Sequence, residues 1–247
     1  MSRPTPQTAP QFEDRLPEQY SRPGINQYLT LHRTYGPPLY PASDLPAYKG
    51  RWSELFGREA PLHLEIGAGN GAYLAGLAQQ HPEWNIIGIE IRYKRTVWCA
   101  KKIRAAGLSN AIIGRYHAAY LNDLFTPGSL SGVHVNHPDP WPKDKHEKNR
   151  LISRWFLEDL CSLLIPGGRF RLKSDYEPNC ERVVELLDRN AEGEALPRLP
   201  LNILGRSSDV NGEGAPWEND IPTEYQQKML ILGVPVHALE AERTSDP

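Results

Sequence analysis

The stretch "LHLEIGAGNGAY", Leu62 to Tyr73, joins a strand pattern to a glycine loop. The apolar residues of "LHLEI" lead directly into Gly67, Gly69 and Gly71. Glycines in this position let the backbone approach a ligand and present N–H groups at the start of the following helix. The string also satisfies the dinucleotide-binding pattern G-x-G-x-x-A. Taken alone, the loop indicates a nucleoside cofactor and does not separate NAD from other cofactors of that class.

On the C-terminal side of this stretch, strand patterns and helix patterns alternate. Short apolar runs typical of buried strands lie at 62–67, 85–91, 111–116, 132–136 and 169–175. Helical spacing separates them at 72–82, 93–107, 119–125, 150–168 and 180–190. Strands that alternate with helices pair in parallel, so the pattern predicts a doubly wound α/β sheet with helices on both faces. Residues 191–222 read as irregular, and 223–240 as a helical turn and a final strand.

The two ends of the chain differ in composition from its middle. Residues 1–24 are rich in Pro, Gln and charge, so we expect a disordered arm. Residues 25–60 read as an ordered or semi-ordered lead-in segment with a short helix that has Asp44 as cap and Gly57 as stop. The main domain is expected at 61–240, and 241–247 are a tail.

Composition limits the classes of protein to consider. The three cysteines are far apart and form no CxxC pair, which favours a reduced cytoplasmic protein without a zinc or other metal site. The N-terminal residues contain no apolar signal core, and no apolar run approaches the length of a membrane span. We therefore expect no membrane association.

Two glutamates beside the glycine loop narrow the choice of cofactor. Glu90 ends the second strand, 19 residues after Gly71, where a carboxylate can accept hydrogen bonds from both ribose hydroxyls. Glu65 lies inside the first strand, and a carboxylate there would repel the two phosphates of a dinucleotide. A cofactor with a positively charged amino-acid end is more compatible with Glu65. The pair therefore favours S-adenosylmethionine.

A second informative stretch is "VNHPDPWPKDKHEKNRL", Val135 to Leu151. Prolines bracket Asp139 and restrict its backbone, and Trp141 offers a stacking surface for a base. The lysines and the arginine that follow are suited to phosphates; they are Lys143, Lys145, Lys148 and Arg150. A second basic run has seven Lys and Arg and no acid from Ile91 to His117, although the net charge is −2. It is either a polyanion-binding patch or a solvated helix face.

Together, these motifs resemble the bacterial tRNA (guanine-N7-)-methyltransferase family. The resemblance covers roughly Trp52 to Leu239 and is carried by "LEIGAGNG", "GIE", "HPDPWPKDKHEKNR", "KSDYEP" and "TEY" in this order. It implies a Rossmann-like class I methyltransferase fold. It also implies methyl transfer from S-adenosylmethionine to a guanosine in the tRNA variable loop, with tRNA as the partner and no protein partner.

The resemblance also assigns roles to individual residues. Asp139 corresponds to the catalytic or guanine-positioning acid, next to the cofactor. The cofactor-binding set is Glu65, Gly67, Gly69, Gly71, Glu90, His117, Ala118 and Asp139. The substrate-binding set is Lys143, Asp175, Thr223 and Gln226, with Lys145 and Arg150 beside them. Asp175 has an alternative role as the cap of the helix that starts near Glu177.

Two of these residues depart from the family pattern. His117-Ala118 stands where the family has Asp-Ala, and a neutral imidazole nitrogen can accept from the adenine amino group. Gln226 replaces a carboxylate near the C-terminal end. These departures leave open a relative that binds RNA or cofactor without methylating. A nicotinamide-dependent oxidoreductase is the remaining alternative, although the chain offers no clear acid/base pair for hydride transfer.

The chemistry of guanine N7 explains why one acid is enough. N7 carries a lone pair and no proton, so its attack on a methyl group needs no base. Alignment and placement of charge matter more. Asp139 can accept hydrogen bonds from the pairing edge of guanine, reject adenine, and stabilise the positive charge of the methylated purine.

Overall fold

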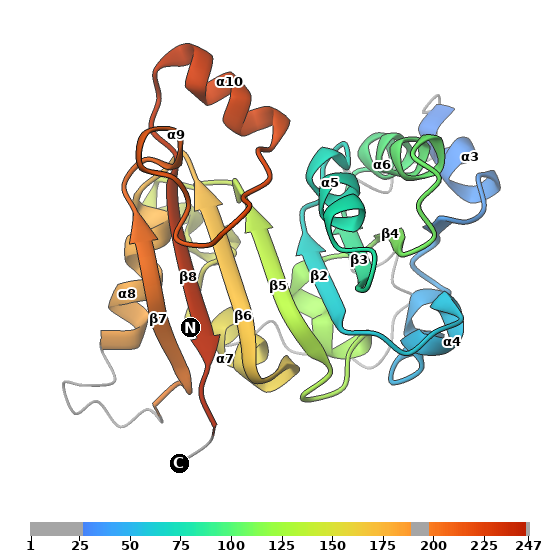
Figure 1. Cartoon of the computed structure of the whole chain (residues 1–247), viewed down its shortest axis with the longest axis horizontal. Helices are drawn as coiled ribbons and strands as arrows, with labels where there is room; N and C mark the ends of the chain where they lie inside the picture. Colours follow the sequence, from blue (N-terminus) through green and yellow to red (C-terminus); the bar gives the residue numbers. More distant parts are fainter. Residues whose placement is uncertain (1–26, 189–197, 246–247) are drawn as a thin grey trace. The chain divides into compact units, whose positions relative to one another are not determined.

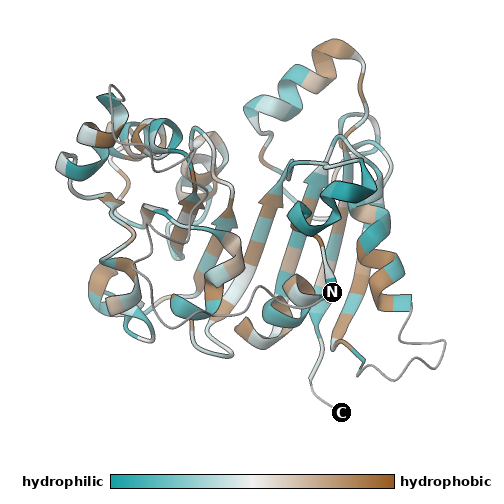
Figure 2. Cartoon of the chain, turned by 180° about the vertical axis from the view of Figure 1, so that it is seen from behind, coloured by the Kyte–Doolittle hydropathy of each residue, from teal (hydrophilic) through white to brown (hydrophobic). Residues whose placement is uncertain are grey.

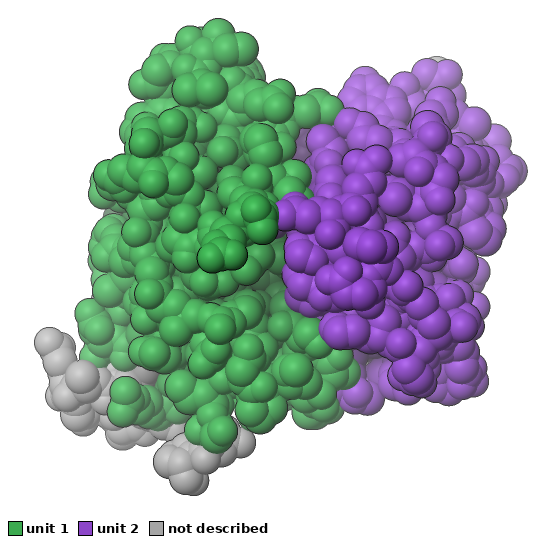
Figure 3. Space-filling view, viewed as in Figure 1, with its two compact units in different colours: residues 1–3, 127–247 green, residues 4–126 purple. Residues whose placement is uncertain are grey.

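The computed structural model describes residues 27–188 and 198–245. The arm expected at 1–24 lies outside these residues. The chain divides into two compact units, one ending at Thr126 and one starting at Pro127 (Figure 3). Each unit is described by itself below.

The first unit contains four parallel strands. They are β1 (Leu39–Tyr40), β2 (Leu62–Ile66), β3 (Asn85–Glu90) and β4 (Ala111–Arg115), in the order β1-β4-β3-β2. Every residue of β2, β3 and β4 is buried, as expected for parallel strands covered on both faces. Ile66 pairs with Ile89, and Glu90 with Arg115, so these strands end together. The glycine loop and Glu90 therefore share one edge of the sheet.

The helices of the first unit follow its strands. They are α3 (Gln27–Thr34), the 3₁₀ helix η1 (Leu45–Tyr48), α4 (Trp52–Phe56), α5 (Ala72–Gln80), α6 (Tyr93–Ala105) and the 3₁₀ helix η2 (Ala118–Asp123). The single helix expected over residues 44–57 is divided into η1 and α4, because Gly50 between them takes a positive φ of 73°. Gly57 stops α4 in the left-handed conformation, as the sequence predicted.

The lead-in segment, expected to be ordered or semi-ordered, includes the helix α3. This helix packs against α6, and His32 on its inner side is buried. The Tyr28 ring contacts Trp98 edge-on, and the His32 ring contacts Tyr93 in the same way. Aromatic packing on α6 thus stabilises a helix that the prolines and low apolar content of the lead-in segment did not predict.

The second unit contains β5 (Leu130–Asn136), β6 (Leu164–Ser174), β7 (Leu201–Ser207) and β8 (His237–Arg243), in the order β5-β6-β8-β7. The pair β5–β6 is parallel, and β8 runs antiparallel to both β6 and β7. Its helices are η3 (Asp144–Asn149), α7 (Arg154–Leu163), α8 (Pro178–Asp188), α9 (Val210–Glu213) and α10 (Glu224–Leu232). Figure 1 shows α10 beyond the end of the sheet at which β6 finishes.

Two sequence-based expectations in this unit were wrong. Residues 191–222 were expected to be irregular, yet β7 and α9 lie there. β7 is at the edge of its sheet and buries few side chains, so its sequence lacks an apolar run. The helix expected over 150–168 is shorter, because Leu164 starts β6 and the Pro-Gly-Gly segment belongs to that strand.

Burial follows the pattern of an α/β protein. Figure 2 shows apolar residues along the strands and mixed faces on the helices. The inner side of α7 is buried through Phe156, Leu157 and Leu160. At the end of α10, by contrast, Leu230, Ile231 and Leu232 are exposed. Within the described ranges, no helix is both long and apolar enough to cross a membrane.

Candidate functional site

The glycine loop takes a conformation that requires glycine. Gly67, Gly69 and Gly71 have φ values of 76°, 57° and 80°. A Cβ on Gly71 would lie 2.8 Å from Cα of Cys99 in α6, so this residue also allows close packing of the loop on the helix. A Cβ on Gly67 would meet no atom within 4 Å. The loop is therefore packed against α6 at Gly71 and open at Gly67, where space remains for a ligand to approach the backbone.

Glu90 holds this loop through its buried carboxylate. One oxygen accepts from the N–H of Gly69 at 3.2 Å, and the other accepts from the N–H groups of Ile91 and Arg92 at 2.8 and 3.0 Å. Arg95 lies 3.7 Å away and adds a cation. Glu65 is buried within β2. Burial raises the pKa of the Cys99 thiol in the middle of α6, and the charges of Glu65 and Glu90 raise it further.

His117 lies at the N-terminus of η2, and its geometry corrects one expectation. Its Nδ1 accepts from the backbone N–H of Ala119 at 3.0 Å, so Nδ1 carries no proton. Burial lowers the pKa of His117, which favours the neutral ring. The hydrogen is then on Nε2, which becomes a donor. His117 cannot accept from an adenine amino group as the sequence analysis supposed. Ala118, also in the predicted set, is the first residue of η2 and is half-buried.

The Pro-Asp-Pro-Trp segment leaves Asp139 exposed on a restrained loop. His137 and Trp141 on either side have positive φ values of 49° and 40°, which are costly for residues with side chains. Arg150 donates from Nε to the Trp141 carbonyl at 3.0 Å and from a terminal nitrogen to the Pro142 carbonyl at 3.3 Å. Asn179 donates to the Pro138 carbonyl. The loop is thus clamped on both sides of Asp139.

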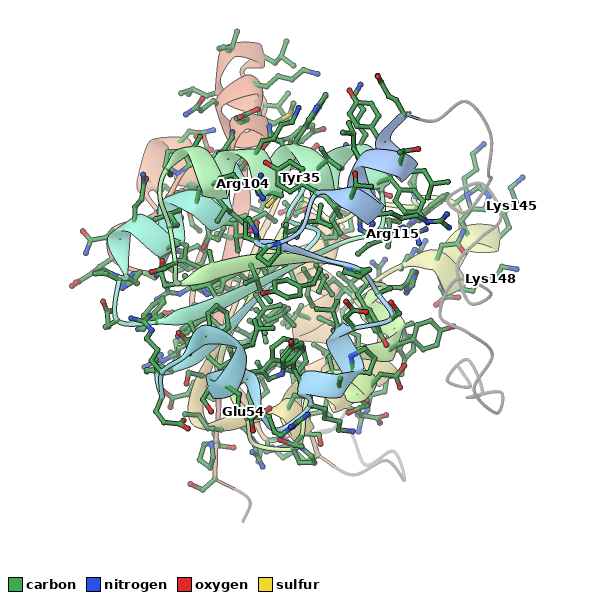
Figure 4. All side chains as sticks on the ribbon, turned by 90° about the vertical axis from the view of Figure 1, so that its right-hand side faces the viewer. Tyr35, Glu54, Arg104, Arg115, Lys145 and Lys148 are labelled. Carbon is green, nitrogen blue, oxygen red and sulfur yellow. The ribbon has the colours of Figure 1, made fainter. Side chains whose placement is uncertain are left out.

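The basic residues that follow divide into two groups. Lys143, Lys145 and Lys148 are exposed, and Figure 4 shows the last two reaching away from the chain at η3. The Arg150 side chain is only 11% exposed and uses its donors on the loop. The structure therefore gives Arg150 a clamping role that the sequence did not suggest, and its contact with RNA stays a prediction.

Asp175 ends β6 inside a polar cluster. One oxygen lies 3.1 Å from Nδ1 of His137, and the other accepts from the Tyr225 hydroxyl at 3.2 Å. The His137 and Tyr225 rings meet edge-on, with centroids 4.7 Å apart. Burial raises the pKa of Tyr225, and the charges of Asp175 and Asp139 also raise it. Asp175 and Tyr225 are therefore in direct contact, and the Asp139 charge acts on the Tyr225 hydroxyl.

Sequence reasoning missed His137 and Tyr225 in this cluster. Both lie inside the motifs that carried the resemblance, but the resemblance assigned roles there to other residues. Burial lowers the pKa of His137, against the opposing effect of Asp175, so the neutral ring donates from Nδ1 to that carboxylate. The two oxygens of Asp175 contact His137 and Tyr225, which does not favour its alternative role as the cap of α8.

Gln226 and Thr223 lie in a buried network below this cluster. Lys173 of β6 is 1% exposed, and its Nζ donates to both oxygens of Asp220, at 3.0 and 3.2 Å. It also donates to Oε1 of Gln226 at 2.9 Å and to the Ile221 carbonyl at 2.8 Å. Thr223 caps α10 by accepting from the N–H of Gln226. Asp220 therefore supplies the negative charge that an amide at position 226 lacks, and substrate contact by Thr223 and Gln226 stays a prediction.

Metal-ligating side chains do not gather in the part of the chain that the structure describes. No group of three or more His, Cys, Asp or Glu residues there is arranged to hold a metal ion.

Comparison with known proteins gives these residues a context. A family described as "Putative methyltransferase" matches residues 59–239. The tRNA (guanine-N(7)-)-methyltransferase of Bacillus velezensis is 35% identical over 83% of this chain and 89% of its own. The enzyme of that name from Bacillus subtilis is 33% identical over 79% and 86%.

Among solved structures, the similarity is one of fold. An antibiotic-related methyltransferase is 18% identical and aligns with a TM-score of 0.57 over 77% of this chain and 92% of its own. The 16S rRNA methyltransferase KamB aligns with a TM-score of 0.56 at 16% identity, over 79% and 94%. The fold is thus the Rossmann-like methyltransferase fold that the resemblance implied, built on the α/β sheet that the alternating pattern predicted. Identity and coverage together show that the chain belongs to the tRNA (guanine-N(7)-)-methyltransferase family.

Proposed function

We propose that this protein transfers a methyl group from S-adenosylmethionine to N7 of a guanosine in the variable loop of tRNA. The observation that supports this most directly is Asp139. It is an exposed carboxylate on a clamped loop, two residues after His137, which contacts Asp175, in a chain of this family. Because tRNA is the substrate, we place the reaction in the cytoplasm.

The first unit is proposed to bind the cofactor, and its residues suit that group. Open space over Gly67 and the positive φ values of the loop allow close approach of a nucleoside. Glu90 retains one lone pair, on the oxygen that accepts from Gly69, for a ribose hydroxyl, and Glu65 supplies charge for the amino-acid end. His117 is proposed to donate from Nε2 to an adenine ring nitrogen, beside Ala118. When bound, S-adenosylmethionine supplies the activated methyl group.

The second unit is proposed to hold the guanine. Asp139 accepts from the N–H donors of the pairing edge, which adenine lacks in that arrangement. N7 forms a bond to the methyl carbon while the bond from that carbon to sulfur breaks, and the electron pair stays on sulfur. The positive charge then passes to the purine, where the Asp139 carboxylate stabilises it. Asp175, held by His137 and Tyr225, is a second acceptor for the nucleoside.

The exposed lysines are proposed to bind phosphates beside the target base. Lys143→Ala should weaken tRNA affinity about three- to ten-fold at low salt, because it removes one phosphate contact. The affinity for S-adenosylhomocysteine, measured by calorimetry, should be unchanged. Equal loss of both affinities would contradict this division of labour between the units.

The alternative of a relative that binds RNA or cofactor without methylating was based on His117 and Gln226. The structure removes the argument from Gln226. Gln226 keeps its partner Lys173, and Asp220 supplies the charge, so the amide does not disable this network. The departure at His117 changes a proposed contact with the cofactor and does not change the methyl-transfer step. The nicotinamide alternative has no support from the family to which the chain belongs.

A methyl-transfer assay tests the proposal. Unmodified tRNA transcripts are incubated with labelled S-adenosylmethionine, and the label is mapped by nuclease digestion. We expect one labelled guanosine in the variable loop, and no label when that guanosine is replaced by adenosine. Asp139→Ala should lower the rate about 1000-fold. Incorporation by the wild-type protein at the level of this variant, or at another nucleotide, would refute the proposed activity.

A further inference from the structure

The exposed side of α6 carries a tryptophan between two lysines. Thr96, Val97, Cys99, Ala100 and Ile103 form the buried side of the helix. Trp98 is 41% exposed, and Lys94 and Lys101, four residues before and three after it, are also exposed. Residues at these spacings lie on one face of a helix. Since leaving part of an indole ring in water forgoes favourable burial, this arrangement suggests a ligand.

Packing with α3 orders this group of side chains. Nζ of Lys94 lies 4.5 Å from the centre of the Trp98 ring and 5.7 Å from that of Tyr28. Tyr28 meets Trp98 edge-on, with centroids 6.4 Å apart and planes at 88°. The two rings and the ammonium group therefore form one cluster in advance of any ligand, which reduces the entropy lost on binding.

The two helices that carry the cluster contain basic residues and no acidic ones. Neither α3 nor α6 contains an Asp or Glu, and no acidic residue occurs from Ile91 to His117. Arg33 on α3 adds a further exposed cation. The nearest preceding acid in sequence is Glu90, whose buried carboxylate is bonded to backbone N–H groups. Such a face attracts a polyanion.

Two other basic residues of this run, Arg104 and Arg115, have structural roles that separate them from the cluster. Arg104 donates to the carbonyls of Tyr35 and Pro37, and its guanidinium lies 4.0 Å from the centre of the Tyr35 ring (Figure 4). Arg115 is buried, with its guanidinium 3.9 Å from the centre of the Tyr93 ring. The sequence run of seven cations is thus partly structural, and Lys94 and Lys101 are among the members that remain exposed.

We propose that Tyr28, Lys94, Trp98 and Lys101, the α3–α6 face, bind a second part of the tRNA through phosphates and an unstacked base. This inference rests on the proposed tRNA substrate. Exposed lysines around an aromatic ring suit single-stranded RNA, in which phosphates and base faces are both accessible. A protein partner fits less well, because lysine is depleted in protein interfaces.

Equilibrium binding of unmodified tRNA to the full-length protein, measured by fluorescence anisotropy at several salt concentrations, tests this face. Lys94→Glu with Lys101→Glu should weaken binding at least ten-fold and reduce the salt slope by about 1.5, as expected when two phosphate contacts are lost. Trp98→Ala should weaken binding about ten-fold without changing the slope, since stacking carries no counterions. Trp98→Phe should restore most of the affinity.

Arg51→Glu is the matched control, because Arg51 is an exposed cation in the same unit, next to α4 and away from both helices. It should leave tRNA affinity within two-fold of wild type. Affinity for S-adenosylhomocysteine should be the same in every variant and verifies the fold. If tRNA affinity is unchanged in the lysine pair and in Trp98→Ala, the α3–α6 face is not an RNA contact. Binding is read without methyl transfer, so this result and a failure of the proposed activity are distinguishable.

Discussion

Glu90 is the last residue of one parallel strand and Asp139 lies three residues after another, yet their surroundings are opposite. The Glu90 carboxylate is buried and accepts three backbone N–H groups of its own loop. Asp139 is exposed, and side chains such as Arg150 and Asn179 hold the backbone beside it. The Glu90 carboxylate therefore holds its own loop in place. The Asp139 carboxylate is positioned by other side chains, and the loop does not depend on it.

This difference separates stability from function. A change at Glu90 should affect both, because removing an acceptor leaves buried donors without partners. A change at Asp139 should affect the reaction alone, since exposed side chains contribute little to folding. Substitutions at and around both sites test this contrast.

Glu90→Ala should produce the largest combined loss. Loss of three accepted hydrogen bonds should lower the free energy of unfolding by about 3 kcal/mol, measured by urea denaturation. Affinity for S-adenosylhomocysteine should fall at least about 100-fold, because the loop loses its anchor together with the ribose acceptor. Asp139→Ala, as the matched acid-to-alanine change, should stay within about 0.5 kcal/mol of wild-type stability. Equal stability losses would remove the contrast between the two sites.

Asp220→Asn should destabilise the second unit by about 3 kcal/mol, because it leaves the buried ammonium of Lys173 without its carboxylate. Gln226→Glu is the informative control. It adds a carboxylate beside the same ammonium and should cost less than about 1 kcal/mol. Thermal and urea unfolding of both variants measure the difference. A greater loss for Gln226→Glu than for Asp220→Asn would show that the amide, rather than Asp220, satisfies Lys173.

Acid should destabilise the first unit through His32 on α3. Burial lowers the pKa of His32 from 6.5 to about 4, with further lowering by Arg115 and Arg33. The unfolded chain then binds more protons than the folded one below about pH 6.5, so stability falls as pH decreases toward 4. Between pH 7 and pH 5 this residue should account for about 2 kcal/mol. His32→Gln removes the titrating group and should flatten this part of the pH dependence of unfolding, and an unaltered profile would exclude His32 as its source.

Arg150→Ala should lower the free energy of unfolding by about 1 kcal/mol, because one of the two bonds it loses is partly buried and the other is exposed. Methyl transfer should fall about ten-fold as the Asp139 loop loosens. Arg150→Lys separates the clamp from the predicted phosphate contact, since lysine keeps the charge but not the fork of donors. If Arg150→Lys restores the rate, binding of phosphate is the main role of this residue, and if it does not, clamping of the loop is.

Much of the fold could be predicted, because the strands around the glycine loop are buried on both faces. Such strands read as continuous apolar runs, and β2, β3 and β4 occur where the sequence predicted them. β7 and α3 escaped prediction for the opposite reason. β7 lies at a sheet edge with few buried side chains, and α3 is held by aromatic contacts with α6, which is about 65 residues further along the chain.

Residue identity alone indicated the chemical groups of the site: glycines after a strand, an acid at the end of the next strand, and an acid between prolines before a basic run. Tertiary structure decided what those groups are able to do. Contact with Ala119 makes His117 a donor, Asp220 completes the network of Gln226, and Arg150 is a clamp instead of a free cation. The physical reason is that a side chain's type fixes its donors and acceptors, whereas its neighbours in space, distant in sequence, decide which of them are already used.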